Sequence, residues 1–275
     1  MEPLSRVHVL AKAMRLHNGL ACALILWVGR SRVEGSTVEI NAIAGVAVVL
    51  LSSAAHLVND LLDFGADRAN RPDRALPAGL LSAADLRRAA LSTWLAGMIL
   101  GVVVIPEWTA WWLVWGLAGP GYSLIAKGRS WLAPIWTAIV IASCWAAGAL
   151  EGGLRLLDVP VFAGMVLYLV FRERVKALED SPGDVLAGHR AMTCTFSGTP
   201  LGVLCLGATL VPFGVWLAYS GSGLLVHLAA LLFLACLVGG GWSLLNPRPR
   251  VPHLAGSLLK VGAFAGVTLL WIVVP

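Results

Sequence analysis

The residues best suited to chemistry lie in one stretch, residues 59–79, which reads NDLLDFGADRANRPDRALPAG. Asn59, Asp63 and Asp67 recur every four residues, so on a continuing helix all three would project from one face within about two turns. This stretch directly follows a long apolar run, where carboxylate side chains are energetically unfavourable unless cations neutralise them. A row of carbonyl and carboxylate oxygens therefore predicts a site for a hard metal ion.

A second acidic stretch covers residues 176–190, KALEDSPGDVLAGHR. Asp180 and Asp184 again stand one helical turn apart after an apolar run. Two acidic helix ends so far apart in the chain can face each other only in a folded bundle. Mg²⁺ keeps some of its water and bridges a few carboxylates to substrate phosphates, so the two stretches together predict a diphosphate ligand.

The composition indicates a polytopic membrane protein. Of the 275 residues, 58% are hydrophobic and 13% are charged, and the mean hydropathy is +0.81. Soluble proteins have roughly a quarter of their residues charged. The five cysteines show no C-x-x-C spacing, which argues against a zinc site or a disulfide framework. We expect one domain over residues 1–275, without a cleavable signal peptide.

Nine apolar segments are near the length of roughly 17 to 25 residues that a membrane helix needs. They predict an all-α protein with nine transmembrane helices in a bundle around a central cavity. Gly116, Gly119, Pro120 and Gly121 interrupt the fourth segment, and such a break is expected to line a cavity. The segments are 13–29, 39–60, 83–105, 109–126, 131–150, 158–177, 197–219, 223–244 and 256–274.

The basic residues predict the orientation, because Lys and Arg in short loops favour the cytoplasm. Of the 20 Lys and Arg residues, only Arg30, Arg32 and Arg155 fall on one side of this topology. The other side holds the N-terminus and both acidic stretches, which are therefore placed at the cytoplasmic face. Loop bias and contact with anionic lipids account for the net charge of +5 better than nucleic acid does.

The two acidic stretches are similar to the paired aspartate motifs of the UbiA superfamily of intramembrane prenyltransferases. The first motif, N-x-x-x-D-x-x-x-D followed by P-x-R-x-x-P-x-G, is matched by Asn59, Asp63, Asp67, Pro72, Arg74, Pro77 and Gly79. The second, D-x-x-G-D-x-x-x-G with a basic residue nearby, is matched by Asp180, Gly183, Asp184, Gly188 and Arg190. The chain departs from many relatives at Ala177, where they carry an aspartate, and at Ala191–Thr193, where they carry T-L-P.

The resemblance also implies which side chains contact a diphosphate. Arg74, Lys127 and Arg190 are the cationic candidates. Tyr122 and Lys127 resemble a Y-x-x-x-K-type loop with a longer spacing, and RLHN at residues 15–18 resembles an R-P-x-N opening that places Asn18 near the substrate cavity.

Three neighbouring residues have supporting roles in this interpretation. Arg15 is a further cationic candidate in the first helix. Asp60 points about 100° away from Asn59, so we expect it to support the site and not to touch the metal. His56, one turn before Asp60, is expected to be a hydrogen-bonded helix residue.

The implied chemistry is ionisation of a polyprenyl diphosphate, with Mg²⁺ and cationic side chains stabilising the leaving group. In the first interpretation the prenyl group is transferred within the membrane to an aromatic, quinonoid or lipid acceptor. In the alternative, a UbiA-type terpene cyclase, the cation closes on its own chain and no acceptor enters. Trp115 and Trp145 are candidates to stabilise the cation. A transporter or lipid-binding membrane protein is a third interpretation, which predicts acidic residues in the middle of spans.

Overall fold

The computed structural model describes residues 6–127, 132–153, 155–156, 158–186, 209–210, 214, 224–245 and 256–266. Within these ranges the side chains of residues 178–186, 224–227, 229 and 240–245 lie outside the description. Every element of the described ranges is a helix, and no strand occurs in them. The all-α prediction is therefore confirmed for the described part of the chain.

The helices succeed one another through most of the described sequence. They are α1 (Arg6–Met14), α2 (Leu16–Arg30), α3 (Val38–Leu62), α4 (Phe64–Asn70), α5 (Ala83–Val104), η1 (Pro106–Trp108), α6 (Thr109–Gly121), η2 (Tyr122–Ala126), α7 (Leu132–Glu151), α8 (Asp158–Leu186) and α10 (Leu224–Leu245). Residues 256–266 are also helical.

Among the residues that the structure describes, three helices are long and apolar enough to cross a membrane, namely α3, α5 and α7. The pair α1 and α2, bent by 47°, would be a fourth span if counted as one. The nine predicted spans and the central cavity thus stay predictions, and the predicted segment 197–219 lies almost wholly outside the described residues. The sidedness of the loops is likewise still a prediction.

The chain forms two compact units. Unit 1 comprises Met1–Trp27, Ser36–Lys127 and Pro182–Arg190, and unit 2 comprises Val28–Gly35, Gly128–Ser181 and Ala191–Pro275. Each unit combines segments that are distant in sequence. The expectation of a single domain over residues 1–275 stays a prediction.

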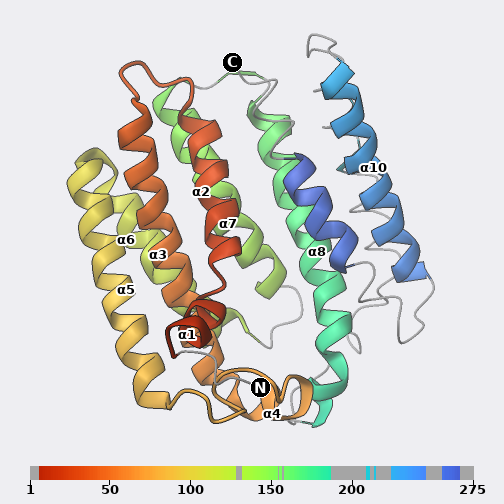
Figure 1. Ribbon diagram of the computed structural model, residues 1–275. Helices are drawn as coiled ribbons and strands as arrows, with labels where there is room; N and C mark the ends of the chain where they lie inside the picture. The colour runs from red at the N-terminus through yellow and green to blue at the C-terminus, as the bar shows by residue number, and fades with distance from the viewer. Residues whose placement is uncertain are drawn as a thin grey trace. The chain divides into compact units, whose positions relative to one another are not determined.

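Helix α3 is the centre of unit 1. It contacts α1, α4, α5, α6 and η2, and its small residues allow close packing (Figure 1). Ala44, Ala47, Val48, Leu51 and Leu57 are almost wholly buried along its length. Because α3 also carries the first acidic stretch, its packing decides where those side chains point.

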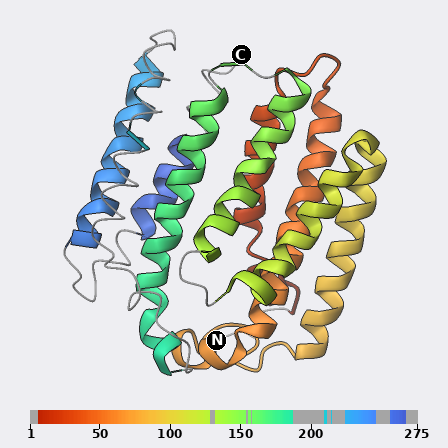
Figure 2. The ribbon, with the colours of Figure 1, turned by 180° about the vertical axis from the view of Figure 1, so that it is seen from behind.

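The fourth predicted segment is a continuous helix and not a broken one. Pro120 lies inside α6. The ribbon of α6 passes directly into η2 (Figure 2). This π-helical turn is closed by a hydrogen bond from Lys127 N to Tyr122 O at 2.9 Å. A Cβ on Gly119 would come within 2.5 Å of the Ala55 Cβ on α3. Glycine at this position therefore allows α6 to approach α3 and brings η2 beside the acidic stretch.

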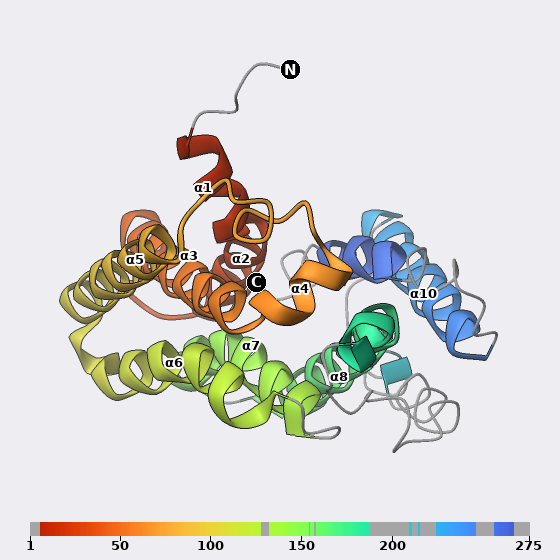
Figure 3. The ribbon, with the colours of Figure 1, turned by 90° about the horizontal axis from the view of Figure 1, so that it is seen from below.

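Helix α3 ends one residue before Asp63, which has φ −88° and ψ 3° and joins α3 to α4 (Figure 3). The expectation of one continuing helix is corrected at this residue. The hydrogen bonds nevertheless keep a four-residue spacing, with Asp63 N donating to Asn59 O at 2.9 Å and Asp67 N to Asp63 O at 2.8 Å. Asn59, Asp63 and Asp67 therefore follow the chain in steps of one turn despite the bend.

A series of turns joins α4 to α5. Ala78 N donates to Arg74 O at 2.9 Å, and Gly79 has a φ of 70°, a left-handed conformation that glycine adopts without a steric penalty. Leu81 is buried in a small apolar cluster with Leu57 of α3 and Leu86 of α5. This cluster holds the loop that carries Arg74 against the end of α3.

Unit 2 is held by contacts of α7 and α8 with the end of α2 and the loop that follows it. The ion pairs Arg30–Glu151 and Arg32–Asp158, the second at 3.0 Å, join residues 28–35 to the ends of α7 and α8. The Tyr168 hydroxyl of α8 donates to Leu259 O in the helical segment 256–266. Residues from distant parts of the chain therefore stabilise the first half of α8.

We expect Gly119→Ala to destabilise the protein, because the new methyl group would overlap the Ala55 Cβ. Overpacking of this kind costs about 1–3 kcal/mol. Circular dichroism during heating would measure the loss as a lower Tm. Gly65→Ala is the matched control, since a Cβ there meets nothing within 4 Å; equal Tm values for the two variants would contradict the close approach.

Candidate functional site

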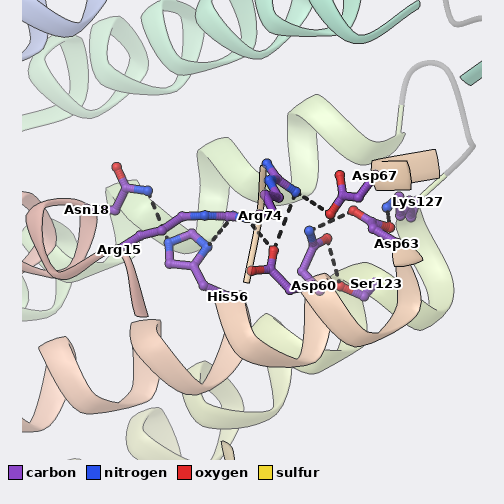
Figure 4. Close-up of polar contacts among 10 residues, drawn as sticks. Arg15, Asn18, His56, Asp60, Asp63, Asp67, Arg74, Ser123 and Lys127 are labelled. Atoms are coloured by element: carbon purple, nitrogen blue, oxygen red, sulfur yellow. Dashed lines mark hydrogen bonds and ion pairs between the residues drawn. The ribbon is translucent and has the colours of Figure 1, made fainter. Parts of the chain in front are cut away.

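The predicted site residues of unit 1 converge at the end of α3. They come from four segments: the junction between α1 and α2, the α3–α4 junction, the loop after α4, and the end of η2 (Figure 4). These segments are separated by many residues in sequence, so the convergence is a property of the fold.

Asp63 faces the side chains of Lys127 and Asn59. Lys127 Nζ forms an ion pair with Asp63 Oδ1, and Asn59 Nδ2 donates to Asp63 Oδ2 at 2.7 Å (Figure 4). Ser123 Oγ in turn donates to Asn59 Oδ1 at 3.3 Å. The π-helical turn therefore places two polar groups, one inside it and one at its end, directly on the first acidic stretch.

Asp67 faces Arg74, with 2.5 Å between Asp67 Oδ2 and Arg74 Nη1. The Asp67 side chain is 8% exposed and that of Arg74 is 20% exposed. Arg74 Nη1 also lies 3.5 Å from Asp60 Oδ1. One guanidinium thus bridges carboxylates on α3 and α4.

Arg15 lies at the break between α1 and α2, where its φ is 48°. Its Nη2 donates to Asp60 Oδ1, and its Nη1 lies 3.2 Å from His56 Nδ1 (Figure 4). The other ring nitrogen, Nε2, lies 3.1 Å from the Asn18 side-chain amide. The expected hydrogen-bonded role of His56 is confirmed, and Asp60 contacts arginines as its supporting role requires.

The second acidic stretch begins on α8. This helix continues through Leu186, so Asp180 and Asp184 lie one turn apart on one helix. Residues 182–186 belong to unit 1, which places the backbone of Asp184 in the compact unit that holds the first stretch. The side chains of Asp180 and Asp184 lie outside the described residues, and so does the whole of Arg190.

The charges of the described site balance one another. Three cations, Arg15, Arg74 and Lys127, pair with the three carboxylates of Asp60, Asp67 and Asp63. Charges this far from water are tolerated when they are paired and hydrogen-bonded. In the described ranges, no three His, Cys, Asp or Glu side chains gather into a group that could hold a metal.

The donor chemistry nevertheless fits a hard cation. Asn59, Asp63 and Asp67 contribute only oxygen as ligand atoms, and these residues lie on successive turns. Mg²⁺ takes carboxylate and carbonyl oxygens, keeps some of its water and also binds substrate phosphates. The same residues therefore fit Mg²⁺, provided that their present cationic partners turn to another anion.

Tyr122, Trp115 and Trp145 are the remaining candidates from the sequence. Tyr122 begins η2, next to Ser123, which the sequence interpretation did not identify, because a π-helical turn is invisible in residue spacing. Trp115 stacks on Trp111 at 5.8 Å in unit 1. Trp145 belongs to unit 2, and the Arg32 guanidinium lies over its ring at 5.8 Å.

Comparison with known sequences identifies a family and several relatives. The model of the UbiA prenyltransferase family matches residues 20–268. A digeranylgeranylglyceryl phosphate synthase from Methanoculleus marisnigri is 26% identical over 96% of this chain and 97% of its own length. A protein of the same name from Methanoregula boonei is 30% identical over 82% of this chain and 83% of its own.

Solved structures share the fold. A digeranylgeranylglyceryl phosphate synthase superposes with a TM-score of 0.68 at 17% identity, covering 98% of this chain and 99% of that one. A UbiA homolog from Archaeoglobus fulgidus bound to GPP and Mg²⁺ gives 0.66 at 14% identity, covering 95% and 99%. At these identities the agreement concerns the arrangement of helices alone.

We expect the pair Asp63–Lys127 to contribute to stability, because both side chains are mostly buried. In a double-mutant cycle with Asp63→Asn and Lys127→Met, the coupling free energy should reach about 1 kcal/mol or more. Chemical unfolding would measure it. The exposed pair Asp85–Arg88 is the control, for which a much smaller coupling is expected because water screens its charges; equal coupling in the two cycles would show that the Asp63 pair is not special.

Proposed function

Because the chain belongs to the UbiA prenyltransferase family, we propose that it ionises a polyprenyl diphosphate with Mg²⁺ and transfers the prenyl group to a lipid acceptor in the membrane. Members of this family are integral membrane proteins, in agreement with the apolar helices α3, α5 and α7. The observation that carries the proposal is the interleaving of carboxylates and cations at the end of α3, which suits a metal and a diphosphate together.

The carboxylates are proposed to hold the metal. Asn59, Asp63 and Asp67 would bind Mg²⁺, and the resemblance of the second motif proposes Asp180 and Asp184 as further ligands. When bound, Mg²⁺ neutralises the charge that develops on the departing diphosphate. The Mg²⁺ and GPP bound to the A. fulgidus homolog support this assignment, and so does the oxygen-only donor set described above.

The cations are proposed to hold the diphosphate. Arg74 and Lys127 already pair with Asp67 and Asp63, so each would lie close to the phosphate oxygens that Mg²⁺ would join to those carboxylates and could donate to them. Donors placed in advance around a leaving group lower the barrier most in a site poor in water. Arg190, Tyr122 and Asn18 are the further diphosphate contacts that the sequence motifs propose.

The relatives favour a lipid acceptor among those that the sequence left open. Two of them carry the name digeranylgeranylglyceryl phosphate synthase and align over more than four fifths of the chain. We propose a glyceryl phosphate lipid as the acceptor and a geranylgeranyl diphosphate as the donor. The changed residues Ala191–Thr193 in the second motif keep terpene cyclisation as the second candidate.

In the presence of Mg²⁺, purified protein in lipid nanodiscs should convert geranylgeranyl diphosphate and geranylgeranylglyceryl phosphate into a doubly prenylated lipid and diphosphate. Mass spectrometry of the lipids and an assay for released diphosphate would measure this. The same mixture without the acceptor tests the terpene cyclase alternative. A cyclic hydrocarbon formed there would refute the transferase proposal and favour the cyclase. Chelation of the metal should stop both products, and added Mg²⁺ should restore them.

Replacement of a carboxylate in either motif should reduce turnover strongly. We expect Asp63→Asn and Asp184→Asn each to lower kcat by about 1,000-fold, equivalent to roughly 4 kcal/mol of lost transition-state stabilisation. Asp73→Asn is the matched control, because Asp73 is an exposed carboxylate in the same loop as Arg74. Diphosphate release that persists in both motif variants would refute the proposed roles and favour a transporter or lipid-binding protein.

A further inference from the structure

We propose that Asp60 is a positioning residue that holds Arg15 and Arg74 as a pair of adjacent cations facing the diphosphate, and that it does not hold the metal. This proposal rests on the function proposed above. It assigns a role to a buried carboxylate that lies beside the metal-binding positions but has different partners from theirs.

One oxygen of Asp60 joins two arginines. Arg15 Nη2 and Arg74 Nη1 both approach Asp60 Oδ1, and the Asp60 side chain is only 8% exposed (Figure 4). Two like charges this close repel one another, and the repulsion grows as water is excluded. The carboxylate between them offsets the repulsion, so both guanidinium groups can stay at the same end of α3.

Asp60 differs from its neighbours in the change it would undergo when a diphosphate binds. Among the residues that the structure describes, Asp67 forms its ion pair with Arg74 and Asp63 forms its ion pair with Lys127, so those carboxylates can exchange a cation for a metal. Asp60 is shared between two arginines, one of which comes from the junction of α1 and α2. It is therefore able to keep Arg15 and Arg74 in place while Asp67 releases Arg74.

His56 fixes Arg15 from the other side, and its proton can be assigned. A guanidinium can only donate, so His56 Nδ1 must accept from Arg15 Nη1 at 3.2 Å. A neutral imidazole then carries its proton on Nε2 and must donate to Asn18. This assignment requires the Asn18 amide to present its carbonyl oxygen to the ring, which exchanges the positions of its oxygen and of the nitrogen placed 3.1 Å from Nε2.

These bonds form one chain that runs from Asn18 through His56 and Arg15 to Asp60. Arg15 is held in it at a φ of 48°, a left-handed conformation that is unfavourable for a non-glycine residue. Such a conformation persists where the surrounding contacts determine it. The break between α1 and α2 is thus held in place by the carboxylate that also orients Arg74.

The first experiment compares Asp60→Asn with wild type and with the control Asp73→Asn, using geranylgeranyl diphosphate in nanodiscs. Asparagine keeps the shape but not the charge. We expect KM for the diphosphate to rise about 10-fold or more, which is the loss of roughly 1.4 kcal/mol of binding. We expect kcat to change less than about 3-fold and the Mg²⁺ concentration for half-maximal rate to stay unchanged. Asp60→Glu should recover part of the KM.

Two outcomes would overturn the proposal. A large shift in the half-maximal Mg²⁺ concentration, with a collapse of kcat, would make Asp60 a metal ligand. An unchanged KM together with a lower Tm would leave it a purely structural ion pair.

The second experiment does not depend on turnover. Nitrogen-15 NMR of histidine-labelled wild type, with His56→Gln to identify the signal, should show His56 protonated on Nε2. Asp60→Asn should disturb that pattern, and Asp73→Asn should not. Protonation on Nδ1 in wild type would refute the chain of bonds, whether or not the protein transfers prenyl groups. A wild type that lacks turnover but shows the Nε2 pattern would refute the proposed function and leave the chain of bonds from Asn18 to Asp60 standing.

Discussion

The arrangement of unit 1 depends on the need to neutralise carboxylates near the end of an apolar helix. Asp60, Asp63 and Asp67 lie within two turns of one another, largely shielded from water. Unpaired, each would be strongly destabilising. The fold brings one cation to each of them from a different segment of the chain. The same neutralisation that keeps the folded state stable leaves a set of positive and negative groups that a metal and an anionic substrate can share.

Each cation reaches the site through an irregularity in the backbone. Arg15 occupies a break between two helices, Arg74 belongs to the turns that end at Gly79, and Lys127 caps a π-helical turn. A regular helix would carry its side chains along its own axis and would not converge with two others. The regular parts, chiefly α3 with α5 and α6, supply the rigid frame against which these departures are held. Precision at the site thus comes from strained or unusual segments anchored on well-packed ones.

Much of this could be predicted from residue types and spacing. The helical class is implied by the composition, and the acidic stretches are visible in a four-residue repeat that persists despite the bend at Asp63. The role of His56 is consistent with its place one turn before Asp60. The π-helical turn and Ser123 could not be foreseen, because helical periodicity assumes regular geometry. Nor could the pairing of Arg15 with Asp60, since contacts between distant segments depend on packing that only the folded chain defines.

The π-helical turn of η2 also constrains how this segment can vary in length. Its ring closes over five residues instead of four, so it holds one more residue than an ordinary turn. Removing one residue between Tyr122 and Ala126 would leave the four-residue ring of an ordinary α-helical turn, whereas the same deletion in the regular part of α6 would rotate everything after it by about 100°. The surplus residue of η2 therefore makes it the part of this segment in which a one-residue change of length disturbs the position of the Lys127 ammonium beside Asp63 least.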